Sequence, residues 1–475
     1  MLFNSLEFLL FFPIVLILFF YLSERLKWIF LLIASYIFYM SWKWEYIILI
    51  LISTMVDYWA GLKMGTIEKK SKRKKFLLLS IFSNLGILFS FKYFNFFSHS
   101  IGALLSSQKV FYDIPTLDVL LPVGISFYTF QTLSYSIEIY RGKIKPERNL
   151  GKFALYVAYF PQLVAGPIER PGHLLPQLWK KLKLNGDQVA SGLKLILWGY
   201  FKKVCIADRL AEYVNIVYND PNNYYGLSIW IATIFFSFQI YCDFSGYSDI
   251  AIGSARIMGI DLMKNFRTPY FSQSIAEFWR RWHISLSYWF RDYVYIPLGG
   301  NRVKLNRWYF NLFVTFLLSG LWHGANWTFV IWGGLHGLYM ILANVRDRLI
   351  YKIKIANNSF TSNRLINVFS TFSLVLFSWI FFRANNLQES IIVIRNAFNF
   401  SNFNFVLIEE FDFLVSWYLL GILLIAEYLH EKKSLNLRLK KYPILVRWSL
   451  YSFFIILILF LGVFFEKQEF IYFQF

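Results

Sequence analysis

Residues 308–344, WYFNLFVTFLLSGLWHGANWTFVIWGGLHGLYMILAN, decide the class of fold, because they hold two apolar runs joined by the polar turn SGLWHGAN. Arg307 stands directly before the first run and Arg346 shortly after the second, which places both outer ends on one side of a membrane. The first run has about fifteen residues and covers roughly 22 Å as a helix, against a hydrocarbon layer of about 30 Å. The stretch therefore predicts two membrane helices with His323 held deep in the bilayer.

The composition of the whole chain agrees with this prediction. Hydrophobic residues make up 57% of the 475 residues and charged residues 16%, whereas soluble domains average about 45–50% and about 25%. Aromatic residues alone account for 21%. A water-soluble domain could not bury this much apolar surface, and a disordered chain would have far less of it. The sequence is that of a multi-pass membrane protein.

Apolar runs of comparable length recur along the chain. They lie at about 6–22, 28–41, 45–62, 76–97, 119–140, 190–215, 226–242, 308–322, 326–345, 365–383, 413–430 and 447–465. We expect an all-α polytopic membrane protein with about 11–12 transmembrane helices and a single membrane domain over residues 1–475. Within it we distinguish N-terminal helices (1–97), a catalytic core (119–345) and C-terminal helices (365–475).

Charged residues between the runs predict the orientation. The basic loops hold Arg25 and Lys27, Lys63–Lys75, Arg141–Lys152, Lys180–Lys183, Arg256–Arg307, Arg346–Lys354 and Lys432–Arg447. The alternate loops 98–118 and 216–225 carry almost no Lys or Arg. The positive-inside rule then places the basic loops in the cytoplasm and both termini on the outer side of the membrane. The net charge of +20 is thereby explained by membrane lipids, not by nucleic acid.

Three segments do not read as simple spans. Residues 151–189 contain four prolines and cannot form one helix, residues 243–262 (DFSGYSDIAIGSARIMGIDL) begin with polar groups at the end of a span, and residues 274–307 are amphipathic. Irregular backbone at membrane depth is tolerated only where protein or a wet cavity covers it. We therefore expect re-entrant and amphipathic helices around an internal cavity.

The amphipathic segment begins SIAEFWRRWHISLSYWF, and Ser274 with Glu277 predicts a capped helix start. One continuous helix would present a polar stripe opposite its aromatic face. That stripe consists of Arg280, His283, Ser287 and Arg291. It suits either an interfacial helix whose arginines reach lipid headgroups or a basic wall that binds an anionic donor. The imidazole of His283 would have no role in a helix that only contacts lipid headgroups.

Other chemistry-bearing residues give weaker signals. His336, in GGLHG, lies thirteen residues after His323 and reads as a packing residue, because a straight helix would separate the two by about 20 Å. Cys205 and Cys242 lie in apolar runs and also read as packing residues. No spacing of histidines, cysteines or carboxylates predicts a metal site, and no glycine loop predicts a phosphate cradle. Gly320 and Gly324, around His323, predict a close approach by another group.

Taken together, the motifs resemble the membrane-bound O-acyltransferase (MBOAT) superfamily, in its bacterial alginate and peptidoglycan O-acetyltransferase branch. The resemblance spans nearly the whole chain. It rests on residues 1–15, LPVGISFYTFQTLSYSIEIYRG (121–142), YFPQLVAGPIERP (159–171), DFSGYSDIAIG (243–253), 266–302, SGLWHGANWTFVIWGGLHG (319–337) and the final FIYFQF. The MBOAT fold, with a central tunnel, is what it implies. His323 matches the family's essential histidine, and His283 matches its second polar position.

The resemblance further implies acetyl transfer from acetyl-CoA, across the membrane, to a hydroxyl of a cell-surface polysaccharide or peptidoglycan. It also implies an extracytoplasmic partner, an SGNH-type acetyltransferase, and no bound cofactor. The loops and residues 384–412, with Glu409, Glu410 and Asp412, are candidate docking surfaces for that partner. D-alanyl transfer to teichoic acid is the alternative within the superfamily.

The chemistry itself can be argued from the residues. A hydroxyl is a poor nucleophile until a base takes its proton, and a desolvated imidazole is neutral and able to do so. We expect His323 to be this base, with His283 or Asn326 orienting it or stabilising the oxyanion. Arg280 and Arg291 would hold the phosphates of the donor, and Trp322 and Ser287 complete the predicted substrate-binding set. A thioester donor needs neither ATP nor a metal.

Two readings outside the enzyme class stay open at this point. A transporter or flippase of a lipid-linked saccharide could use the same histidines as a proton relay. A non-catalytic subunit could merely anchor an extracytoplasmic enzyme. The first predicts substrate movement without covalent change, and the second predicts that His323→Ala is harmless.

Overall fold

The computed structural model describes residues 1–108, 115–164, 166–354, 363–400, 410–432, 441–464 and 470–473. Throughout these ranges the regular structure is helical, which confirms the predicted all-α class. Seven of the described helices are long and apolar enough to cross a membrane, and the apolar helix Leu6–Tyr21 is somewhat shorter. The chain is thus a multi-pass membrane protein.

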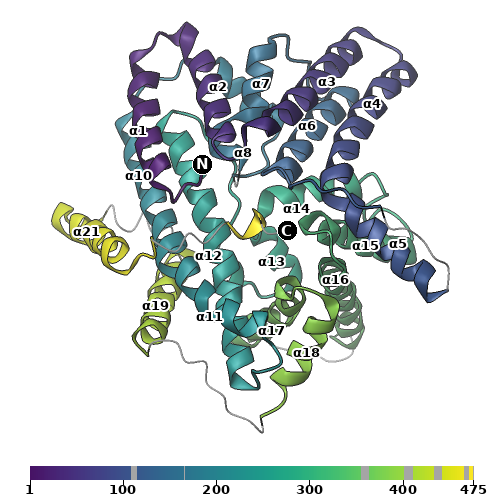
Figure 1. The fold of residues 1–475 in the computed structure, drawn as a ribbon, viewed down its shortest axis with the longest axis vertical. Coiled ribbons are helices and arrows are strands. Elements are labelled where there is room, and N and C mark those ends of the chain that lie inside the picture. Colours follow the sequence, from purple (N-terminus) through teal and green to yellow (C-terminus); the bar gives the residue numbers. More distant parts are fainter. Residues whose placement is uncertain are drawn as a thin grey trace. The chain divides into compact units, whose positions relative to one another are not determined.

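Two compact units make up the chain. The first consists of residues 1–196 and 248–263, and the second of residues 197–247 and 264–475. Helices of the first unit are α1 (Leu6–Tyr21), α2 (Glu24–Met40), α3 (Ile47–Thr66), α4 (Lys70–Leu88), α5 (Phe94–Ser107), α6 (Ile125–Tyr140), α7 (Leu150–Ala158), α8 (Phe160–Leu163), α9 (Pro171–Leu174) and most of α10 (Gly186–Tyr200). In this unit α3, α4 and α6 lie side by side (Figure 1).

A polar cluster joins these three helices. Asp57 of α3 is fully buried and accepts hydrogen bonds from Ser80 and Asn84 of α4 and from Ser136 of α6. Buried carboxylates need such donors because an unsolvated charge is costly. The prolines of residues 151–189 break that segment into the short helices α7, α8 and α9, as predicted.

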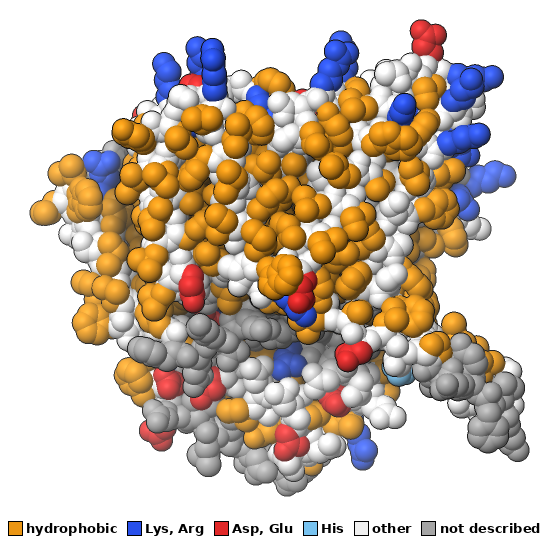
Figure 2. All heavy atoms as spheres, turned by 45° about the horizontal axis from the view of Figure 1, so that its top comes forward, with side chains coloured by type: hydrophobic (Ala, Val, Ile, Leu, Met, Phe, Trp, Pro, Cys, Tyr) orange, Lys and Arg blue, Asp and Glu red, His pale blue; other side chains and the backbone are white. Residues whose placement is uncertain are grey.

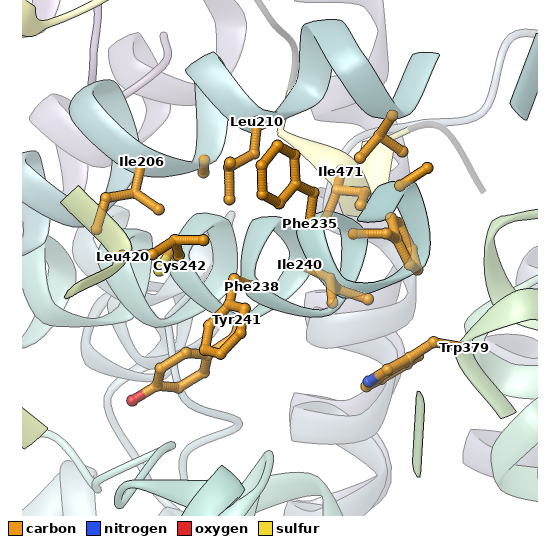
Figure 3. Close-up of a cluster of buried hydrophobic side chains, with 14 of the residues drawn as sticks. Ile206, Leu210, Phe235, Phe238, Ile240, Tyr241, Cys242, Trp379, Leu420 and Ile471 are labelled. Atoms are coloured by element: carbon orange, nitrogen blue, oxygen red, sulfur yellow. The ribbon is translucent and has the colours of Figure 1, made fainter. Parts of the chain in front are cut away.

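Helices of the second unit are α11 (Asp208–Asn219), most of α12 (Leu227–Ile257), α13 (Ile275–Arg281), α14 (Ile284–Phe290), α15 (Leu305–His323), α16 (Trp327–Lys354), α17 (Arg364–Arg383), α18 (Leu387–Ala397), α19 (Glu410–Lys432) and α21 (Ile444–Leu461). Its core is aromatic and aliphatic. Figure 3 shows side chains of α11 and α12, among them Leu210, Phe235 and Cys242, together with Ile471 near the C-terminus. Both cysteines are buried and free, as packing residues are.

The surface matches a lipid environment. Figure 2 shows hydrophobic side chains over most of one face, with Lys and Arg side chains at its upper edge. Large apolar side chains on several apolar helices are strongly exposed, for example Leu6 (76%), Leu365 (78%) and Phe460 (81%). In water such a surface would aggregate, whereas hydrocarbon chains cover it without cost.

Two predictions about helix continuity were wrong. The segment from Ser274 is not one helix: α13 ends at Arg281, and α14 begins only at Ile284. Conversely, α12 continues without a break through DFSGYSDIAIG, which was expected to be irregular. Its polar residues face buried partners, since Ser245 accepts a hydrogen bond from Lys202 (2.8 Å). They mark contacts between helices and not a helix end.

Candidate active site

His323 is the last residue of α15, and its side chain is buried, with 2% exposed. Its Nδ1 lies 2.6 Å from the carbonyl oxygen of Ser319, one turn earlier on the same helix. A carbonyl only accepts, so Nδ1 must carry the proton and donate it. In the neutral ring the lone pair therefore lies on Nε2. Nε2 is thus the nitrogen that can take a proton.

The glycines around His323 permit a tight turn between two antiparallel helices. A Cβ atom on Gly320 would lie 2.2 Å from the carbonyl oxygen of Phe329 on α16, and one on Gly324 would lie 2.2 Å from the Phe329 ring. The close approach predicted from these glycines is thus made by α16 itself. It brings Trp332 of α16 to 4.8 Å from the imidazole of His323, measured between ring centroids.

His283 lies at the break between α13 and α14. Its backbone is left-handed, with φ 40° and ψ 55°, which costs about 1–3 kcal/mol for a residue other than glycine. Its side chain is fully buried. Its carbonyl begins α14 by accepting from Ser287 N (3.0 Å), and the next amide, of Ile284, donates to Asn265 O (2.9 Å). Strained backbone that is held in this way is typical of functional sites.

The two histidines, 40 residues apart in the sequence, come together here. Their ring centroids are 6.3 Å apart and the rings are inclined by 75°. Aromatic rings enclose the pair. Rings that contact at least one of the two imidazoles are those of Phe244, Phe266, Trp322, Trp332, Phe382 and Tyr472. This apolar surround favours uncharged imidazoles.

Tyr472 was missed as a single residue, although the motif FIYFQF contains it. Its ring lies 5.8 Å from His323 and 6.3 Å from His283, between centroids. The turn that carries it is anchored, because Ile471 N donates to Asp243 Oδ2 (2.7 Å). Asp243 also forms a buried ion pair with Lys203 (2.8 Å). No periodicity could reveal this, since the signal lies in contacts between residues far more than one hundred positions apart in the sequence.

The remaining predicted site residues have different surroundings. Trp322 joins the pair, 5.9 Å from His283 and 5.0 Å from His323 between centroids. Asn326 begins α16: its Oδ1 accepts from Thr328 N (3.1 Å), and its Nδ2 donates to Asn385 O (2.8 Å). Both polar atoms of its side chain are thus hydrogen-bonded to backbone groups.

The polar stripe predicted for residues 280–291 does not exist as one face, since the helix breaks inside it. His283 is buried, whereas Arg280 and Arg291 are exposed. The Arg291 guanidinium pairs with Asp292 (2.8 Å). Ser287 is half-buried and donates to Trp282 O (3.3 Å).

His336 packs in the core of the second unit, but the predicted separation of about 20 Å was wrong. His323 ends α15 and does not share α16 with His336, and the Trp332 ring lies 4.8 Å from the His323 ring and 5.0 Å from the His336 ring, between centroids. The Nδ1 of His336 accepts from Trp279 Nε1 (3.2 Å), so its Nε2 carries the proton and donates to Ser378 Oγ (3.0 Å). Ser378 in turn donates to Val375 O (2.7 Å). Both ring nitrogens are thus engaged with protein groups. Within the described residues, no three His, Cys, Asp or Glu side chains are grouped to hold a metal ion.

Two buried histidines side by side in a polytopic helical protein are the arrangement expected of a membrane acyltransferase. The comparison with known families agrees: the model of the MBOAT, membrane-bound O-acyltransferase, family matches residues 16–384. The chain belongs to this family and is an O-acyltransferase.

Individual relatives agree with this assignment. The chain is 43% identical to a probable alginate O-acetylase AlgI of Pseudomonas putida, over 85% of this chain and 81% of the relative. It is 35% identical to a peptidoglycan O-acetyltransferase of Helicobacter pylori, over 77% and 72%. A teichoic acid D-alanyltransferase of Bacillus subtilis is more distant, with 30% identity over 55% of this chain and 68% of its own length. The resemblance to the alginate and peptidoglycan branch is thus confirmed.

Proposed function

We propose that this enzyme moves an acetyl group from cytoplasmic acetyl-CoA across the membrane to a hydroxyl of an extracytoplasmic polysaccharide or peptidoglycan. The observation that carries the proposal is the hydrogen bond from His323 Nδ1 to Ser319 O, beside His283. This hydrogen bond fixes the proton of the neutral ring on Nδ1, so Nε2 is the unprotonated nitrogen, and apolar side chains surround it. The relatives named alginate O-acetylase and peptidoglycan O-acetyltransferase support the class of acceptor.

His323 acts as the general base in this proposal. Nε2 takes the proton of the acceptor hydroxyl while its oxygen attacks the thioester carbon and forms a tetrahedral oxyanion. The intermediate collapses with cleavage of the carbon–sulfur bond, and the leaving thiolate takes the proton from Nε2, which gives the thiol and returns His323 to its neutral form. The Ser319 carbonyl stabilises the imidazolium that forms in between, since Nδ1–H keeps donating to it.

His283 is assigned to stabilisation of the oxyanion or to orientation of the His323 base. Asn326 was the alternative, but its amide nitrogen and oxygen already bond backbone groups of Asn385 and Thr328. An oxyanion donor contributes about 10²–10³-fold in rate. Trp322, Ser287 and the exposed Arg280 and Arg291 remain proposed substrate-binding residues, with the two arginines toward the phosphates of the donor.

The proposed reaction also needs a route and a recipient. Donor and acceptor on opposite sides require a tunnel to His323, with basic loops in the cytoplasm and both termini outside. An extracytoplasmic SGNH-type acetyltransferase is the proposed partner. Of its proposed docking segment, residues 384–412, the stretch 401–409 with Glu409 lies outside the described residues, as do residues 109–114 of the loop 98–118.

The decisive experiment follows label from radioactive acetyl-CoA in inside-out vesicles that hold the chain and its polymer acceptor. We expect label on polymer or partner protein, and none with His323→Ala at equal protein abundance. His99→Ala, which changes an exposed histidine of α5, serves as the matched control. Full transfer by the His323→Ala variant would overturn the mechanism.

The same assay separates the alternatives. A D-alanyltransferase would leave acetyl-CoA untouched and accept a D-alanyl donor instead. A transporter or flippase of a lipid-linked saccharide would move its substrate without any covalent change. A non-catalytic anchor would tolerate His323→Ala.

A further inference from the structure

Two non-glycine residues have left-handed backbone in the described part of the chain, Thr268 (φ 40°) and His283 (φ 40°). Both belong to one small arrangement in the second unit. The segment 265–268 runs beside 281–284, with Arg267 N donating to Arg281 O (2.9 Å) and Ile284 N donating to Asn265 O (2.9 Å). Thr268 and His283 thus lie toward opposite ends of these two hydrogen-bonded segments.

Asn265 holds one end of this pairing. It is buried, and its Oδ1 accepts from the hydroxyl of Ser285 (2.8 Å), which is buried as well. Together with the backbone bond to Ile284, it fixes the residues directly after His283. An asparagine that bonds backbone and side chain in this way leaves the first turn of α14 little freedom.

Arg281 holds the other end. Its Nη1 lies 2.7 Å from Glu431 Oε2 and 3.2 Å from Thr268 Oγ1, and its Nη2 lies 2.8 Å from Glu431 Oε1. Thr268 Oγ1 donates to the same carboxylate (2.7 Å). Nη2 also reaches Glu277 Oε1 (2.5 Å), one turn earlier on α13. We call this group of four side chains the arginine clamp.

The arginine clamp can hold the strained backbone of Thr268 and His283 in place for two reasons. The side chains of Arg281 and Glu431 are each only 13% exposed, and their contact is two-pronged. Such bidentate pairs are stronger and more directional than single surface ion pairs. Between the clamp and His283 lies a single residue, Trp282, whose indole is buried against Phe266 and Trp379. A shift of Arg281 therefore passes directly into the backbone of His283.

We infer that Arg281 is a positioning residue that holds His283 at its distance from His323. It does so through Glu431 and Thr268 and touches neither histidine ring in this role. The inference rests on the proposed function, in which His283 faces the reacting atoms. It differs from the predicted role of the basic residues here, since Arg281 binds protein carboxylates and not the donor.

The test compares Arg281→Gln, Arg281→Lys and Glu431→Gln with Arg364→Gln. Arg364 is the matched control because it lies 3.8 Å from the same carboxylate but is 55% exposed. We expect kcat for acetyl transfer to fall by about ten- to a hundredfold in Arg281→Gln, as for a misplacement near 1 Å, with KM for the donor nearly unchanged. Arg281→Lys keeps the positive charge but loses the two-pronged guanidinium contact, and its kcat should lie between those of the wild type and Arg281→Gln.

Hydrogen–deuterium exchange supplies a readout that needs no activity. The amides of Arg267 and Ile284 should exchange faster in Arg281→Gln and Glu431→Gln, and at the wild-type rate in Arg364→Gln. The inference is overturned if kcat of Arg281→Gln stays at the wild-type value, if Arg364→Gln loses as much, or if kcat falls while both amides remain protected. Should the wild type transfer no acetyl group, the proposed function fails, and the exchange rates alone decide whether the clamp holds His283.

Discussion

Gly320 offers the sharpest perturbation of the site, because its replacement by alanine changes the spacing of α15 and α16 without touching a histidine. The added Cβ would lie 2.2 Å from the carbonyl oxygen of Phe329 and 3.2 Å from the Cα of Gly333. Both neighbours are backbone atoms, which cannot swing aside as a side-chain tip can. Relief requires the two helices to separate.

The required movement can be read from the structure. Ordinary contact of a Cβ begins at 3.4 Å, so the helices must part locally by about 1 Å. His323 is three residues from Gly320, and Trp332 on the opposite helix is 4.8 Å from its ring. A displacement of this size costs about a hundredfold in rate when it reaches the reacting groups. Overpacking adds about 1–3 kcal/mol of lost stability.

The assay is acetyl transfer from labelled acetyl-CoA, normalised to the amount of folded protein, together with thermal unfolding in detergent. Gly334→Ala is the matched control on the same helix pair. Its Cβ would meet Leu317 at 3.4 Å and Phe313 at 3.9 Å, which is ordinary contact. We expect Gly320→Ala to lose activity per folded molecule and Gly334→Ala to keep it. Equal activity of the two variants would refute the argument that helix spacing sets the position of His323.

Three further predictions test other contacts. Ser378→Ala removes the acceptor of His336 Nε2 and should cost about 1–3 kcal/mol in thermal unfolding, with unchanged transfer per folded molecule. Asp243→Ala removes the acceptor of Ile471 N and should speed carboxypeptidase release of the C-terminus, whereas no change would refute the anchoring. A hydrogen bond with Glu169 raises the pKa of His173. The contribution of this pair to the stability of the fold is therefore present below about pH 6.5 and is lost as the pH rises through the raised pKa of His173. Thermal unfolding between about pH 5.5 and 8.5 should therefore decline less in His173→Gln than in the wild type, and parallel curves would contradict this.

Much of the fold followed from local signals in the sequence. The apolar run after Arg307 and the polar turn SGLWHGAN predicted α15 and its end within a few residues, and the helix ends at His323. Ser274 with Glu277 predicted the start of α13, where Ser274 Oγ accepts from Glu277 N. These signals are local because caps and hydrophobic length act within one or two turns.

The break at His283 had no such signal. Neither glycine nor proline stands at Trp282 or His283, and the helical periodicity continues across them. The helix ends there because Asn265 and Arg267, more than ten residues earlier, supply the backbone bonds that replace a helical turn. Such a break is decided by tertiary contacts, which the periodicity of one segment does not contain.

Three buried histidines of the second unit, His283, His323 and His336, show how polar residues in a membrane protein can be told apart. His336 sits inside a regular helix, and protein groups engage both of its nitrogens. His283 instead has strained backbone. His323 ends its helix, and because its Nδ1 donates to Ser319 O, its unprotonated nitrogen is Nε2. Stability alone explains the first arrangement, but it gives no reason to hold a histidine in a left-handed conformation. Burial is common to all three residues, so the proposed roles rest on the strained backbone of His283 and on the Nδ1–H tautomer of His323, neither of which His336 shares.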